Sequence, residues 1–136
     1  MNFHCTKCAG CCTRKNFEAF DDIQLPPEIR FKPNGNCVNL TAENKCAIYE
    51  RRPYLCSMKA IFTRPHIIAK MGKVGAALAE VVKALKTRFA KKQAEKEWYK
   101  FVNSHCNGLI EHLKLSPDYL INIDEQYKEE QVDEKL

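Results

Sequence analysis

Thiol side chains are concentrated at the start of this chain. Four cysteines fall within eight residues, in the order Cys5, Cys8, Cys11 and Cys12. The other four are more widely spaced, at Cys37, Cys46, Cys56 and Cys106. Two residues between cysteines let both sulfur atoms reach one metal while the intervening backbone amides turn toward the thiolates. The spacing therefore predicts that the N-terminal part of the chain wraps around a metal ion or an iron–sulfur cluster.

The cysteine spacing leaves the identity of the metal open. The C-x2-C-x2-C run of Cys5, Cys8 and Cys11 is typical of a 4Fe–4S cluster, which a distant cysteine completes. Zinc more often uses two separated C-x2-C pairs, but it also accepts four cysteines from irregular positions. Cys12 follows Cys11 directly, so the two side chains cannot easily reach one ion. We therefore expect one site drawn from the eight cysteines, with Cys106 the one best explained as core.

Bulk properties indicate a single cytosolic domain. A chain of 136 residues is long enough for one modest core. It has no run of about 20 apolar residues that could span a membrane, and its start does not resemble a secretory signal. In the cytosol disulfides are kept reduced, so the cysteines are expected to be ligands. Disulfide bridges would be the alternative only for a secreted protein.

The first 58 residues carry seven of the thiols, and loop signals dominate this segment. Gly, Pro and Asn punctuate this stretch, and apolar residues alternate only briefly around Cys37 and Cys46. The pattern predicts a short β-hairpin with one of these cysteines near each arm. Arg52-Pro53 would end the second arm and start a helical turn that carries Cys56. Such a segment has little apolar surface, so metal binding would supply stability.

Helical periodicity appears in the second half. From Lys73 to Asn103 there is no proline, and apolar residues recur at steps of three and four. This predicts one long helix with a bend near Lys91-Lys92, ending at Asn107-Gly108. Ser116-Pro117 would start a shorter helix. The expected fold class is α+β, with one metal-binding domain over 1–123 (cysteine cluster 1–58, helical part 59–123) and an acidic, mobile tail over 124–136.

Charge is unevenly distributed and suggests a second function class. Between residues 59 and 100 there are eleven Lys or Arg and three Glu, whereas six acidic residues and two lysines follow from residue 124. A solvated lysine surface is the simplest explanation. The alternative is a metal-folded binding module whose basic helix contacts nucleic acid or an acidic protein partner. The apolar stripe of the helix could also form a dimer. No catalytic set is identifiable, so enzymatic activity stays undecided.

The ordered motif resembles a known family. It reads Phe3-x-Cys5-x2-Cys8-x2-Cys11-Cys12, then Gly35-x-Cys37-x2-Leu40, then Cys46-x-Ile48-Tyr49-Glu50-x-Arg52-Pro53-x2-Cys56. This is similar to the CxxCxxCC (YkgJ-like) cysteine-cluster family, which implies chelation of zinc or of an iron–sulfur cluster, in a structural, redox or metal-handling role. A similar cluster in flagellin lysine N-methylases raises a distant enzymatic alternative. Ala9 and Ser57 depart from the pattern, where many relatives have Gly and a basic residue.

Overall fold

The protein is built from short helical turns in its N-terminal half and longer helices in its C-terminal half. The computed structural model describes residues 10–43 and 45–128. Its α-helices are α1 (Arg14–Phe17), α2 (Met58–Thr63), α3 (Pro65–Ile68), α4 (Gly72–Arg88), α5 (Lys91–His112) and α6 (Ile123–Lys128). Its 3-10 helices are η1 (Gly10–Cys12), η2 (Glu18–Phe20), η3 (Tyr49–Arg51), η4 (Tyr54–Cys56) and η5 (Pro117–Tyr119).

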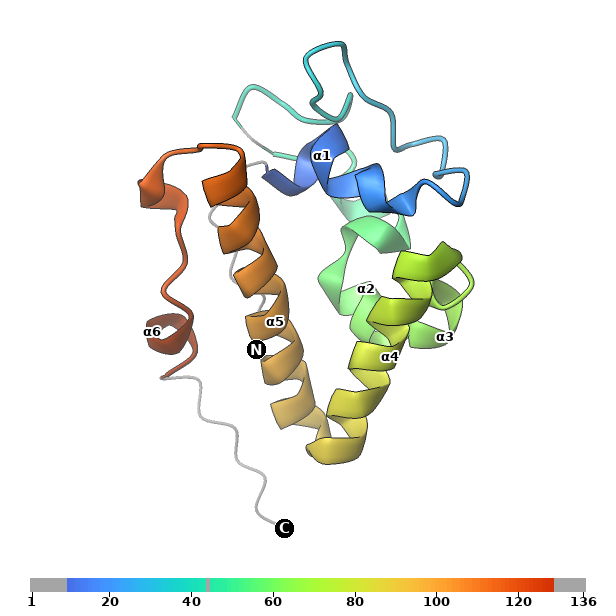
Figure 1. The fold of residues 1–136 in the computed structure, drawn as a ribbon, viewed down its shortest axis with the longest axis vertical. Helices are drawn as coiled ribbons and strands as arrows, with labels where there is room; N and C mark the ends of the chain where they lie inside the picture. Colours follow the sequence, from blue (N-terminus) through green and yellow to red (C-terminus); the bar gives the residue numbers. More distant parts are fainter. Residues whose placement is uncertain (1–9, 44, 129–136) are drawn as a thin grey trace.

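The expected α+β class with a β-hairpin is wrong. Over the described residues there is no strand, and β pairing is limited to three isolated bridges, Thr13 with Asn36, Phe31 with Cys37, and Leu40 with Cys46. The predicted hairpin is reduced to this last bridge, because the chain turns into η3 just beyond it. Pairs this short do not grow into a stable sheet. The fold is therefore helical, with the cysteine-bearing loops at one end of the helices (Figure 1).

The expected long helix is two helices. It breaks at Phe89 and Ala90, which are both extended, and α5 returns alongside α4 (Figure 1). The break lies where the apolar stripe shifts by one position, from Phe89 to Ala90. Two helices can turn both halves of that stripe inward, whereas one straight helix could not. The stripe consequently packs into the chain's own core, with Val82, Ala94 and Trp98 fully buried.

The stop predicted at Asn107-Gly108 is also wrong, since α5 continues to His112. The Asn107 side chain instead binds the backbone of Ile121, accepting from its N–H and donating to its carbonyl, both at 2.8 Å. These two bonds dock the segment that follows α5 onto the helix. Because the Asn107 side chain bonds the backbone of another segment, it does not compete for the backbone of α5, and the helix continues past it.

Close contacts fix α4 in place. The Asp22 carboxylate accepts a hydrogen bond of 2.7 Å from the backbone N–H of Lys73, in the first turn of α4. Gly75 allows α4 to approach α3, because a Cβ at this position would lie 2.2 Å from the carbonyl oxygen of Ile68. Trp98 on α5 donates its indole N–H to the Met58 carbonyl at 2.8 Å, which ties α5 to α2.

The C-terminal segment packs on α5. Tyr127 of α6 is buried, and its hydroxyl donates a hydrogen bond to the side chain of Asn103, which is itself fully buried. Residues 124–128 of the expected acidic tail thus belong to a packed helix, while the rest of that tail, 129–136, lies outside the described residues. None of the helices described here has the length and apolar character needed to cross a bilayer.

Candidate functional site

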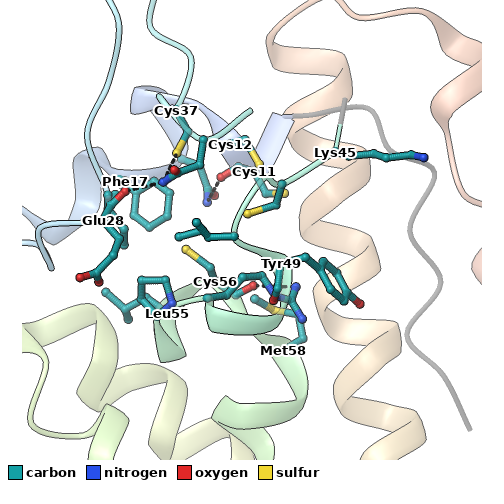
Figure 2. Close-up of a pocket in the computed structure, with 17 residues that line it drawn as sticks. Cys11, Cys12, Phe17, Glu28, Cys37, Lys45, Tyr49, Leu55, Cys56 and Met58 are labelled. Atoms are coloured by element: carbon teal, nitrogen blue, oxygen red, sulfur yellow. Dashed lines mark hydrogen bonds between the residues drawn. The ribbon is translucent and has the colours of Figure 1, made fainter. Parts of the chain in front are cut away.

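Five cysteines line one cavity of about 480 Å³ (Figure 2). Cys11 and Cys12 come from η1, and Cys56 comes from η4. Cys37 and Cys46 come from the loops between η2 and η3, where each takes part in an isolated bridge. The fold therefore gathers thiols that lie up to 45 residues apart in the sequence, from Cys11 to Cys56.

Backbone hydrogen bonds hold these segments around the cavity. The Cys37 N–H donates to the Cys12 carbonyl at 2.7 Å, which joins the first two thiol-bearing segments. The Ala47 N–H donates to the Asn39 carbonyl, also at 2.7 Å, and this keeps Cys46 beside the loop of Cys37. Main-chain contacts of this kind place the thiols without any help from an extended sheet.

Arg52 supplies a fixed positive charge at the cavity wall. Its guanidinium donates to the Tyr49 carbonyl at 2.8 Å and to the Cys56 carbonyl at 3.1 Å. The same group lies 3.9 Å from the centroid of the Tyr49 ring, within cation–π range. Arg52 thereby stabilises the turn between η3 and η4. Its charge only partly opposes the rise in the pKa of Cys11, which the hydrogen bond with Cys12 and burial cause, and the rise in the pKa of Cys56, which burial causes.

The thiols oppose one another's ionisation. Burial, followed by the negative charges of Cys37, Cys11 and Cys46, raises the pKa of Cys56 to about 12. A hydrogen bond between the Cys11 and Cys12 side chains raises the pKa of Cys11 well above its ordinary value and lowers that of Cys12. Cys12 therefore ionises more readily than Cys11 in this pair. Several thiolates can coexist here only if a cation offsets their charge.

The other cavity walls are largely apolar, with two asparagines that hydrogen-bond the backbone around the site. Phe17, Ile29 and Leu55 line the interior and are buried. Asn39 donates its amide N–H to the Glu28 carbonyl at 2.7 Å and lies 3.9 Å from the Cys37 sulfur, within range of a weak N–H···S hydrogen bond. Asn16 donates to the Cys11 carbonyl at 3.1 Å. Neither asparagine belongs to the cysteine motif, so no sequence signal marks them as site residues.

The remaining predicted site residues have different positions. Cys5 and Cys8 lie outside the described residues. Cys106 does not line the cavity and packs against the hydrophobic core. His105 contacts Asn16, whose side-chain oxygen is 2.8 Å from its Nε2. Burial lowers the pKa of His105, which favours a neutral ring at this contact.

The five cavity thiols are not arranged around a common metal position. Among residues 10–43 and 45–128, no group of three or more His, Cys, Asp or Glu is arranged so that it could hold a metal ion. All six cysteines in this part of the chain are free thiols. The arrangement is a thiol-rich cavity, and its side chains would have to turn to enclose a metal.

Comparison with protein-family models, with curated proteins and with solved structures gives no match. The resemblance to the CxxCxxCC family therefore stays a prediction from the motif.

Proposed function

We propose that the cysteine-lined cavity binds a soft metal centre, either a 4Fe–4S cluster or a zinc ion, in a structural, redox or metal-handling role. The observation that carries the proposal is the gathering of five thiols on one cavity, from three separate parts of the chain. Thiolate is the ligand that both zinc and iron–sulfur clusters favour. The residues that would hold the centre are drawn from Cys11, Cys12, Cys37, Cys46 and Cys56.

The electrostatics of the cavity favour a bound cation. Mutual repulsion and burial keep the Cys56 thiol protonated, with its pKa raised to about 12. A metal would displace such protons and neutralise the resulting thiolates. Arg52 would offset any negative charge that remains, since its guanidinium is held at the cavity wall by two carbonyl groups.

Cys5 and Cys8 enter the proposal through their spacing alone. They precede Cys11 at intervals of three residues, so a centre bound by Cys11 would be within reach of a loop that carries them. We propose one centre with spare thiols, and not two. Cys106 is outside this set because its side chain does not line the cavity.

The proposed location is the cytosol. Free thiols are maintained there, and the six described cysteines form no disulfide among the residues described. A measured count of eight free thiols in freshly prepared, metal-stripped protein is the expected result.

Metal analysis of protein purified without oxygen tests the proposal. About four irons per chain with broad absorption near 400 nm would identify a cubane cluster, and about one zinc in colourless protein would identify a zinc site. Cys46→Ser should lower metal content at least several-fold. Cys106→Ser is the matched control, because it removes a thiol that lies outside the cavity. Absence of both metals, or equal losses in the two variants, would overturn the proposal.

A further inference from the structure

Basic residues are concentrated around the turn between α4 and α5. Residues 83–92 include five Lys or Arg and no Asp or Glu. Four of these cations are exposed residues at the tip, and we call them the tip patch: Lys86, Arg88, Lys91 and Lys92. In Figure 1 this tip is the end of the helical hairpin farthest from the cysteine-bearing loops.

The tip patch lacks acidic partners. Ion pairs elsewhere in the described residues join lysines to nearby glutamates, as between Lys83 and Glu80 at 3.6 Å. Within the described part of the chain, no carboxylate pairs with any member of the tip patch. Lys86 donates to the Phe62 carbonyl at 2.6 Å and lies 4.6 Å from the Phe62 ring centroid, so it is held in position at the tip.

The charges at the tip affect the two helices in opposite ways, since Lys86 and Arg88 lie favourably in the last turn of α4. Lys91 and Lys92 occupy the first turn of α5, which has no acidic residue and no side-chain cap. The positive end of the helix dipole lies there, so both lysines are placed unfavourably. Desolvation and the nearby charge of Lys91 lower the pKa of Lys86, which shows that the cations of the patch repel one another. A bound polyanion would relieve this repulsion.

We propose that the tip patch binds the phosphate backbone of a nucleic-acid duplex. The exposed large apolar side chains of the described residues are Val38, Tyr49, Tyr54, Phe101 and Leu120, and none is at the tip. Without them the patch lacks both the anchors by which a helix enters a membrane surface and the aromatic platforms on which single-stranded bases stack. Phe89, the aromatic residue of the turn, is partly buried and packs against the core. Point charges on a convex turn fit regularly spaced phosphates.

The test measures binding of the full chain to a fluorescein-labelled duplex of about 20 base pairs, between about 50 and 200 mM KCl. Four phosphate contacts predict that log K falls against log[KCl] with a slope of about −3.6. The double variant Lys91→Glu/Lys92→Glu should bring the slope to about −1.8 and weaken binding at least tenfold at 100 mM. The same variant puts acidic residues at the start of α5, so its melting temperature should hold or rise. Weaker binding by this variant would then not be caused by unfolding.

The matched control is Lys70→Glu/Lys73→Glu, which makes the same change in net charge at the other end of α4, about 25 Å from the tip. Its slope should match the wild-type slope. Salt-independent or absent binding would overturn the proposal, as would equal weakening by the two double variants. Tighter binding to phosphatidylserine vesicles or to polyglutamate than to the duplex would overturn it in favour of a membrane surface or an acidic protein. None of these outcomes depends on whether the cysteine cavity binds metal.

Discussion

The cysteine-bearing half and the helical half of this protein are held together by different interactions. Among the described residues, the largest fully buried side chains belong to the helical half: Ile61, Phe62, Ile68, Val82, Trp98, Tyr99, Asn103, Ile110 and Tyr127. In residues 10–57 the buried apolar side chains are fewer, and turns and isolated bridges replace longer helices. Phe17, Phe20, Ile29 and Leu55 join the same core from the cysteine half. That half contributes fewer side chains to the core, so it depends more on backbone hydrogen bonds and, under our proposal, on a metal.

The largest effect is expected from the core of the helical half. Trp98 is fully buried and bonds the Met58 carbonyl, so Trp98→Ala should lower the free energy of unfolding by about 3–5 kcal/mol. Urea denaturation followed by far-UV circular dichroism measures this loss. Phe101→Ala is the control, because Phe101 stacks on Trp98 at 5.7 Å between ring centroids but is 46% exposed. If both variants lost the same amount, the core would not be centred on Trp98.

Metal removal should affect only the cysteine half. A ligand present at about 100 times its dissociation constant stabilises the state that binds it by about 2.7 kcal/mol. Chelation should therefore speed exchange of the Cys37 and Ala47 amides, which donate to Cys12 and Asn39, by about 100-fold. Hydrogen exchange followed by mass spectrometry measures this change. Amides of α4 and α5 serve as the internal control, and a matching loss of their protection would contradict the division into two halves.

Arg52 offers a smaller perturbation within the cysteine half. Arg52→Ala removes hydrogen bonds to two carbonyls and the contact with the Tyr49 ring, and we expect a loss of about 2 kcal/mol. Its exposed neighbour provides the control, since Arg51→Ala changes the same charge one residue away. Thermal unfolding of both variants, measured with and without chelator, checks the prediction. Equal melting temperatures for the two would show that the turn does not rely on Arg52.

The sequence predicted the helices better than the connections between them. Apolar residues at steps of three and four located α4 and α5, because burial of a stripe follows directly from helical geometry. The break at Phe89-Ala90 was missed because neither residue disfavours a helix, and the one-position shift of the stripe was taken for a bend. Asn107 was misread as a stop because its partner, Ile121, is distant in sequence. Brief alternation around Cys37 and Cys46 suggested strands, although it is too short to distinguish a strand from a bridge.

For the site, the sequence predicted candidate residues but not which of them the fold brings together. All eight cysteines were candidate ligands: five line the cavity, Cys106 packs against the core and does not line it, and Cys5 and Cys8 lie outside the described residues. Asn16 and Asn39 could not be predicted, because each acts on the backbone through a contact that only the folded chain creates. Contacts of this kind produce no periodic pattern in the sequence.

The smallest effect should come from the packing of α6, which tests how far the helical half extends. The buried Tyr127 hydroxyl donates to Asn103, so Tyr127→Phe leaves a buried amide oxygen without that donor. We expect a loss of about 1 kcal/mol in the free energy of unfolding, the usual contribution of a buried hydrogen bond. Tyr119→Phe is the control, because Tyr119 is only partly buried and should change stability by a few tenths of a kcal/mol. If Tyr127→Phe changed the free energy of unfolding as little as the control, α6 would contribute little to the core. The helical half would then effectively end with α5. A loss confined to Tyr127→Phe would instead place residues 123–128 within the same cooperative unit as Trp98.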